Sequence, residues 1–470
     1  MQTIIDMLND FLWTYVLIAG LLGAGVWFTV RTRFMQFRYL GEMFRVLFDK
    51  TRDVEGMKSI SSFRSFCIGA ATRIGTGNLA GVAVAITLGG PGAIFWMWLV
   101  ALVGGATGFI ESTLAQVFKV RDKDAYRGGP AYYIQKGLNM RWLGILFAIL
   151  IAITFGLIFN SVQSNTIAGA FDNAFGIPPV VMGIVMTVLT AAIIFGGVHR
   201  IAKFSSIIVP IMAVVYVAIA MVVVAMNFSE IPAVLGLIVR SAFGLEQALG
   251  GGIGAAIMMG VRRGLFSNEA GMGSAPNAAA TANVTHPAKQ GFIQTLGVFV
   301  DTLIVCSATA FIILLNADFA GTGAEGIGLL QDSLSLQIGG WASYFVAFAI
   351  FTFAFSSIIG SYYYGETNIE FIRKNKAFVN IYRLLTMALV MFGSTASLGL
   401  VWDLADVFMA LMTIINLVGI VLLGNIAFKV LRDYEEQRRE GLDPVFSPSK
   451  LGIENTEAWE EEEKSDKMVV

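Results

Sequence analysis

Long apolar runs of about 20 residues alternate along this chain with short polar or basic stretches. An apolar run of that length crosses the hydrocarbon core of a bilayer as an α-helix. The pattern predicts eleven such helices, at residues 12–30, 65–88, 92–118, 143–165, 178–196, 205–226, 248–266, 289–315, 341–364, 377–395 and 400–430. The chain is therefore predicted to be an all-α, polytopic membrane protein.

Basic residues fall in alternate loops of this pattern. The segment after the first predicted span, 31–64, contains eight lysines and arginines, whereas the loops at 89–91 and 171–179 contain none. Cytoplasmic loops of membrane proteins are enriched in lysine and arginine. The N-terminus is therefore predicted to lie outside, and the C-terminus in the cytoplasm, of a bacterial-type inner membrane. The polar, acidic tail at 431–470 is predicted to be a solvated cytoplasmic extension.

Apart from the first helix, within residues 1–64, the spans form two groups of five, at 65–226 and 248–430. Because five is odd, the second group enters the membrane with the opposite polarity, which is the topology of an inverted repeat. The first helix of each group is interrupted by glycines, as "IGTGNLAG" at 74–81 and "LGGGIGAAIMMG" at 249–260. Paired interruptions of this kind are the best sequence indication of a transporter's binding site.

An interrupted helix leaves backbone N–H and C=O groups without partners, which is tolerated at membrane depth only where protein, water or a ligand satisfies them. Freed carbonyls suit a small cation and freed N–H groups suit a carboxylate, so an amino acid matches such a site. The alternative is that the glycines only allow close helix packing. Thr76 and Asn78 favour a binding site at the first interruption, whereas the glycines at 250–254 leave the two interpretations nearly even.

Composition agrees with a membrane protein and excludes several other classes. Hydrophobic residues make up 56% of the chain and charged residues 14%, with a net charge of −1. This balance argues against nucleic acid as a partner.

Cys67 and Cys306 lie in apolar runs and are interpreted as buried thiols rather than a disulfide. His199 and His286, the only histidines, fall in separate predicted loops, so neither a metal cofactor nor an intramembrane enzyme is expected. A channel is disfavoured because paired helix breaks indicate an occluded site.

Three motifs resemble the signature of the alanine or glycine:cation symporter family, also called the sodium:alanine symporter family. They are "GGPGAIFWMWLVALVGGATGFIESTLAQVF" at 89–118, "YRGGPAYYIQKGL" at 126–138 and "RGLFSNEAGMGSAP" at 263–276. The resemblance extends from about residue 8 to residue 430. It implies a leucine-transporter-type fold with one additional N-terminal helix, and sodium-coupled symport of a small neutral amino acid. It leaves the oligomeric state open, and proton coupling remains an alternative.

The resemblance also implies site residues. Substrate contacts would come from Gly75, Thr76, Gly77 and Asn78, from Gln163 in "NSVQSN", and from the second interrupted helix at Gly250, Gly251 and Gly252. Sodium would be held by the hydroxyls of Ser356 and Ser357 and the carbonyls of Ala71 and Ile74. Oxygen ligands of this kind suit a hard cation.

One position departs from the family pattern. Many members carry a tryptophan that lines the pocket where this chain has Ser361, in "IIGSYYYGE". The smaller residue would widen the pocket and admit a larger substrate such as glutamine. Alternatively, Tyr362 or Phe355 fills the space and alanine or glycine remains the substrate. The two outcomes are left open.

Four ionisable residues fall inside or beside predicted spans, where an unpaired charge is costly. Asp301 is interpreted as a structural partner of a buried arginine such as Arg262, with a role in cation or proton coupling as the alternative. Arg73 and Glu111 either pair across an inner gate or lie in a hydrated vestibule. Glu269 is expected to cap or gate the inner end of the second interrupted helix.

Overall fold

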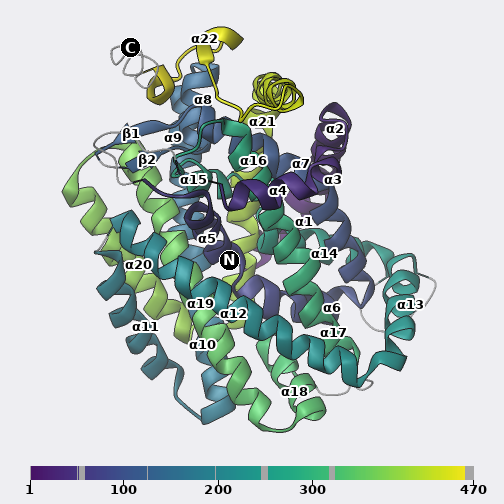
Figure 1. The fold of residues 1–470 in the computed structure, drawn as a ribbon. Helices are drawn as coiled ribbons and strands as arrows, with labels where there is room; N and C mark the ends of the chain where they lie inside the picture. The colour runs from purple at the N-terminus through teal and green to yellow at the C-terminus, as the bar shows by residue number, and fades with distance from the viewer. Residues whose placement is uncertain are drawn as a thin grey trace.

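The chain folds almost entirely into α-helices, as Figure 1 shows for a computed structural model. The structure describes residues 2–49, 51, 59–123, 125–195, 197–244, 252–316 and 323–460. Within these residues the only strands are β1 (Val120–Asp122) and β2 (Ala125–Arg127), which form a small antiparallel hairpin. The all-α prediction is confirmed.

Eight helices of the described chain are long and apolar enough to cross a membrane. They cover Ile5–Arg31, Gly92–Val117, Arg141–Phe175, Lys203–Met226, Pro287–Leu314, Trp341–Ile372, Lys376–Thr395 and Leu398–Arg439. Two shorter apolar helices, Gly77–Gly89 and Pro179–Ile194, lie between them in sequence. The membrane-spanning architecture is therefore confirmed. The count of eleven stays a prediction, because the helices within the predicted spans 65–88, 178–196 and 248–266 are each shorter than 18 residues.

The helices follow the same order in the two halves of the chain. The first half contains α5 (Ser62–Arg73), the π-helix η2 (Gly77–Gly81) with α6 (Val82–Gly89), α7 (Gly92–Val117), α9 (Arg141–Ile153) with η3 (Thr154–Phe159) and α10 (Asn160–Phe175), α11 (Pro179–Ile194) and α12 (Gly197–Met226). The second contains α14 (Ile253–Asn268) with α15 (Ala275–Ala279), α16 (Pro287–Phe299) with η5 (Val300–Cys306) and α17 (Ser307–Leu314), α19 (Trp341–Ile372), α20 (Lys376–Thr395) and α21 (Leu398–Arg439). In each half, an interrupted helix comes first.

Shorter elements flank these helices. The N-terminal helix consists of α1 (Gln2–Phe11), the π-helix η1 (Leu12–Leu17) and α2 (Ile18–Arg31), followed by α3 (Met35–Arg38) and α4 (Leu40–Leu47). The connections carry α8 (Pro130–Leu138), η4 (Phe228–Glu230), α13 (Ile231–Ala242), α18 (Ile327–Ile338) and α22 (Pro448–Leu451). In Figure 1, α18 lies at the end of the molecule opposite α22.

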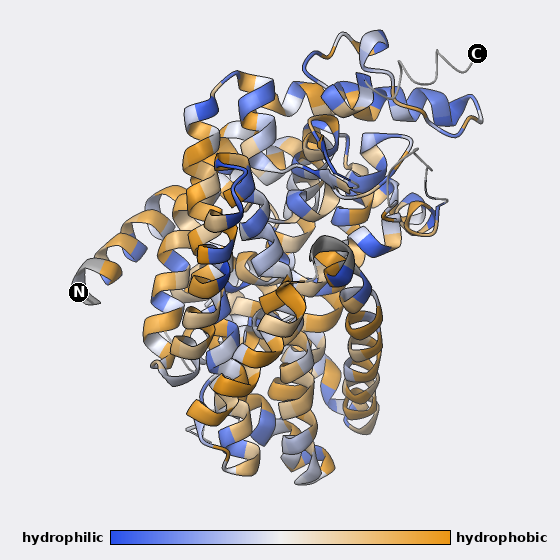
Figure 2. Cartoon of the chain, turned by 90° about the vertical axis from the view of Figure 1, so that its left-hand side faces the viewer, coloured by the Kyte–Doolittle hydropathy of each residue, from blue (hydrophilic) through white to orange (hydrophobic). Residues whose placement is uncertain are grey.

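Hydropathy follows the helices. Figure 2 shows hydrophobic residues along the long helices and hydrophilic residues gathered at the end that carries the C-terminal segment. Many of the outward side chains are apolar, among them Ile184, Val188, Val214 and Leu422. Large exposed apolar surfaces of this kind are expected where lipid, rather than water, is the solvent.

The C-terminal tail differs from its prediction. Trp459 is only 1% exposed, and its indole N–H donates to the carbonyl of Gln116 at 2.8 Å. Phe446 is buried as well, and its backbone N–H donates to the carbonyl of Thr285 at 2.9 Å. The prediction of a solvated extension is therefore wrong for residues 443–460, because the apolar side chains of this segment pack onto the ends of the helices. Residues 461–470 lie outside the described chain.

Candidate functional site

The first interrupted helix breaks where the sequence places "IGTG". Helix α5 ends at Arg73, and Ile74 has extended backbone angles, φ −77° and ψ 92°. The N–H of Gly75 donates to Oδ1 of Asn78 at 2.9 Å, and the N–H of Thr76 donates to Oε1 of Gln163 at 3.0 Å. Two amide side chains therefore satisfy the backbone groups that the break sets free. The structure brings these predicted residues together.

Glycine is required at this break because two other helices approach it closely. A Cβ atom on Gly75 would overlap the hydroxyl of Ser357 on α19 and would lie 3.0 Å from Oε1 of Gln163. A Cβ atom on Gly77 would lie 3.0 Å from the ring of Phe266 and from Cα of Ser267, both on α14. The glycines thus allow close packing and expose backbone, so the two interpretations of the sequence are not exclusive.

The four residues predicted to hold sodium also lie together. The Ser357 hydroxyl is 2.8 Å from the carbonyl oxygen of Ala71 and 3.5 Å from that of Ile74. The Ser356 hydroxyl is 3.5 Å from the Ala71 carbonyl and 2.8 Å from that of Phe353 in its own helix. All of these residues are buried. The result is a cluster of neutral oxygens, the donor type that a hard monovalent cation prefers.

Within the described residues, no interruption lies at 252–254, where the second one was predicted to fall. Gly252 is an exposed N-cap residue, and α14 runs without a break from Ile253 to Asn268. Gly250 and Gly251 lie outside the described residues. The chain leaves the helix at Glu269, where φ is 59°, and continues through left-handed Gly271 and Gly273 before α15 begins. The placement of Gly252 in the pocket is therefore wrong. The physical reason is that Gly252 caps the start of a helix and does not lie at a break within one.

Glu111 supports the second interruption from α7. Its carboxylate accepts hydrogen bonds from the N–H groups of Gly271 at 3.2 Å and Gly273 at 3.1 Å, and from Nδ2 of Asn416 at 2.9 Å. Arg73 forms no ion pair with it in the described chain and instead donates to the carbonyl of Gln294 at 3.4 Å. The pairing of Arg73 with Glu111, one of the two alternatives for these residues, is not observed among the described residues. Glu269 is the C-cap residue of α14, where its carboxylate accepts from Ser274 at 2.6 Å.

Asp301 joins the two interruptions. Its Oδ1 accepts from Nδ2 of Asn78 at 2.6 Å, and its Oδ2 accepts from the hydroxyls of Ser267 at 2.8 Å and Thr302 at 2.9 Å. Its interpretation as the partner of Arg262 is wrong, because Arg262 lies 3.7 Å from Asp406. Asp301 stands in the π-helix η5 and Asn78 in the π-helix η2. Such segments occur frequently at functional sites.

Aromatic rings extend from this region in one chain of contacts. Phe159 and Phe266 have ring centroids 4.6 Å apart, and Phe266 and Trp402 are 4.7 Å apart. Beyond them, the guanidinium of Arg263 lies 4.4 Å from the Trp402 ring and forms a buried ion pair with Asp406. These residues were not among the predicted site residues. They come from three distant parts of the sequence, and no local motif links them.

Ser361 is buried on α19, one turn beyond Ser357 on the same helix face. The two aromatic residues proposed to replace the missing tryptophan point elsewhere. Tyr362 stacks on Tyr382 and Phe355 stacks on Phe351, with centroids 6.0 and 5.7 Å apart. The third tyrosine of this motif, Tyr364, packs against Phe155, with ring centroids 5.6 Å apart.

Comparisons with known proteins agree with this architecture. The chain is 57% identical to the amino-acid carrier protein AlsT of Bacillus subtilis (strain 168), with 98% of each chain covered. It is 53% identical to the probable sodium/glutamine symporter GlnT of the same organism, covering 98% of this chain and 96% of that one. Among solved structures, MhsT in complex with L-phenylalanine aligns with a TM-score of 0.54 at 15% identity, covering 77% of this chain and 89% of MhsT.

That likeness concerns the fold, and it confirms the predicted leucine-transporter-type architecture. The model of the sodium:alanine symporter family matches residues 1–448. A match of this extent includes both helix interruptions, the oxygen cluster and the additional N-terminal helix. The chain therefore belongs to the sodium:alanine symporter family.

Proposed function

We propose that this protein is a symporter that takes up a small neutral amino acid together with sodium by alternating access. The main support is the geometry of the break at 74–76. A carbonyl just before it lies against a hydroxyl of α19, and two amide side chains accept hydrogen bonds from its N–H groups. The family description names sodium and alanine, and the relative GlnT is named a probable sodium/glutamine symporter. These names support the proposal for this chain.

Sodium is assigned to the carbonyls of Ala71 and Ile74 and the hydroxyls of Ser356 and Ser357. At present the hydroxyls donate to the carbonyls, so both kinds of oxygen already converge. A cation there would be bound by all of them and would hold α5 against α19. Neutral ligands are suited to an ion that must also be released, because no fixed negative charge retains it.

The substrate is assigned to the break itself, at Gly75, Thr76, Gly77 and Asn78, and to Gln163 opposite. Its carboxylate would take the N–H groups that Asn78 and Gln163 now satisfy, so no buried donor is left unpaired before binding. Phe159 and Phe266 would pack against its side chain. Ser361 would border the pocket from α19.

Alanine and glycine are the first candidate substrates and glutamine the second. Glutamine is favoured by one observation, which is that Tyr362 and Phe355 both pack away from the position where family members carry tryptophan. A pocket widened in this way has room for a carboxamide, and the Ser361 hydroxyl offers it a hydrogen bond.

The N-terminus is assigned to the outside and the C-terminus to the cytoplasm of the cell membrane. Basic side chains at the end that carries the C-terminal segment, such as Arg127, Lys136 and Lys374, support this orientation. Sodium entry is then favoured by about 2.3 kcal/mol per charge for each 100 mV of membrane potential. One cation per substrate is enough to concentrate an amino acid many-fold.

Uptake of labelled alanine and labelled glutamine into proteoliposomes, with and without an inward sodium gradient, tests the proposal. Accumulation of either amino acid only with the gradient supports sodium symport. Accumulation driven equally well by a proton gradient alone would contradict the proposal that sodium is the coupling ion. Ser361→Trp separates the two substrates: if Ser361 borders the pocket, the variant loses glutamine uptake and keeps alanine uptake.

A further inference from the structure

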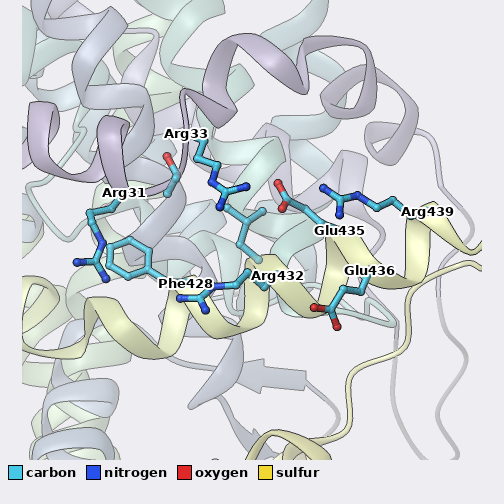
Figure 3. A pocket seen from close by; sticks show the side chains of 9 residues that line it. Arg31, Arg33, Phe428, Arg432, Glu435, Glu436 and Arg439 are labelled. Atoms are coloured by element: carbon cyan, nitrogen blue, oxygen red, sulfur yellow. The ribbon is translucent and has the colours of Figure 1, made fainter.

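A basic pocket lies between the N-terminal helix and the extension of α21, away from the substrate site. Its volume is about 440 Å³. Figure 3 shows arginines of both chain segments around it. The lining residues are Arg31, Thr32, Arg33, Phe428, Leu431, Arg432, Glu435, Glu436 and Arg439.

Positive charge is in excess in this pocket. Arg31, Arg33, Arg432 and Arg439 face two carboxylates, so the lining carries a net charge of about +2 at neutral pH. Of the two carboxylates, Glu435 is already held by Arg38 at 3.1 Å and by the Tyr39 hydroxyl at 2.9 Å. Within the described chain none of the four arginines forms an ion pair. Several guanidinium groups around one space are suited to a phosphate, which accepts paired N–H donors.

The segment that follows Arg33 of the pocket also carries exposed apolar surface. Helix α2 ends its membrane span at Arg31, and the chain then turns into α3 and α4. On α4 the side chains of Met43 and Val46 are buried, whereas Phe44 is 52% exposed. Further exposed apolar residues flank it: Phe34, Phe37, Leu40 and Phe48. A helix with one buried and one exposed apolar face at a span's end is suited to lie in the membrane interface.

The floor of the pocket is apolar as well. Phe428 and Leu431 are buried on α21, and the Arg31 guanidinium lies 5.0 Å from the centre of the Phe428 ring. That contact holds Arg31 over the floor, where its N–H groups are available to an anion. A ligand that combines a phosphate with acyl chains matches both the arginines and the neighbouring apolar surface, whereas free phosphate matches only the arginines.

We propose that this pocket binds the phosphate group of an anionic phospholipid from the cytoplasmic leaflet, whose acyl chains lie along the exposed face of α3 and α4. The bound lipid joins α2 to α21, because its phosphate contacts arginines of both. The leaflet follows from the orientation proposed above. The binding itself does not depend on the transported substrate.

Native mass spectrometry of the detergent-solubilised full chain, titrated with phosphatidylglycerol or phosphatidylcholine, tests this inference. Wild-type protein is expected to bind phosphatidylglycerol in preference to phosphatidylcholine. Arg33→Gln/Arg432→Gln should weaken phosphatidylglycerol binding by roughly fivefold per arginine, and so by roughly 25-fold. The matched control, Arg373→Gln/Lys429→Gln, removes two charges outside the pocket and should bind as wild type does.

Three outcomes would overturn the inference. They are equal affinity for the two lipids, equal loss in the pocket and control variants, and complete displacement of phosphatidylglycerol by inorganic phosphate in molar excess. The last result would mean that the arginines recognise free phosphate. Arg33→Lys/Arg432→Lys keeps the charge but not the paired donors, so retained folding with intermediate affinity is expected. Because these arginines are exposed, the variants should elute from size-exclusion chromatography as wild type does.

Discussion

The hydroxyl of Ser357 lies 2.8 Å from the carbonyl oxygen of Ala71, two residues before α5 ends at its break. The two residues are 286 positions apart in sequence. This contact places a side chain of α19 against the last turn of α5, where the carbonyls lose their helical partners. Whatever changes this contact changes how the two helices are held together.

Removing both hydroxyls should weaken sodium binding. In Ser356→Ala/Ser357→Ala, two of the four assigned oxygens are absent, and we expect the sodium concentration for half-maximal uptake to rise about tenfold or more. Sodium titration of uptake in proteoliposomes measures this. Thr352→Ala is the control, because Thr352 on the same helix bonds only to its own helix at Phe348 and Ala349. Unchanged sodium dependence in the double variant would remove these serines from the site.

A methyl group on Gly75 should abolish most transport. It would overlap the Ser357 hydroxyl, and forcing extra volume into a packed region costs about 1–3 kcal/mol. We expect Gly75→Ala to fold with a lowered melting temperature and to lose at least about 90% of uptake, since about 1.4 kcal/mol is tenfold. Gly23→Ala is the control, because a Cβ atom there has no neighbour within 4 Å. Normal uptake by Gly75→Ala would show that α19 can move away without consequence.

Loss of the Gln163 amide should act on the substrate rather than on sodium. Its Oε1 accepts from Thr76 N–H, and the substrate carboxylate is proposed to take that N–H, which frees the Gln163 amide to bond to the substrate. Loss of one hydrogen bond to a charged group costs about 1.5–3 kcal/mol. Gln163→Ala should therefore raise the substrate concentration for half-maximal uptake roughly tenfold, with sodium dependence nearly unchanged. Asn165→Ala, on the same helix, removes bonds to the carbonyls of Gly393 and Ala396 and serves as the structural control. Equal losses in both substrate and sodium affinity would indicate misfolding instead.

Acid should loosen the docked C-terminal segment. Burial lowers the pKa of His286, although its contact with Asp433 at 3.2 Å opposes this shift. Because the folded pKa lies below the ordinary value near 6.5, the stability from neutral His286 is present above pH 6.5 and is lost as pH falls through the folded pKa. Its ring packs edge-on against Phe446, 5.7 Å away. Limited proteolysis after residue 440 should therefore accelerate below pH 6.

His286→Gln provides the control for that experiment. It should remove most of the difference between neutral and acidic pH, because no titrating ring remains against Phe446. Lys289 bonds to Asp443 at 2.8 Å and Lys450 to Asp433 at 3.1 Å, and the substitution leaves both of these contacts in place. A pH dependence that persists unchanged in His286→Gln would assign it to another group.

The sequence predicted features that local patterns encode. Apolar length gave the helices, and glycine with polar neighbours gave the break at 74–76, because both signals lie within a few residues of the structure they specify. The second break was misplaced for the opposite reason. Its freed N–H groups at Gly271 and Gly273 are satisfied by Glu111, which lies 160 residues before Gly271, while Gly252 of the more conspicuous glycine run is the N-cap of α14.

Long-range packing explains the other differences. Nothing near Phe266 in sequence indicates that it meets Phe159 and Trp402, and nothing near Asp301 indicates that it meets Asn78. The tail carries a weak local signal of its packing. Phe446, Ile453 and Trp459 are apolar residues in an otherwise polar segment, and all three are buried.

The docked tail has a consequence for biosynthesis. Trp459 is translated 343 residues after Gln116, the residue whose carbonyl it binds. The C-terminal segment makes a second contact of this kind, in which Glu457 pairs with Lys136 at 2.6 Å. Early helices therefore enter the membrane long before their contacts with this segment exist, and this face is completed only after Trp459 has left the ribosome. A message truncated just before Asp443 would yield a chain with its apolar spans intact and this face uncovered, a form that cellular quality control can recognise.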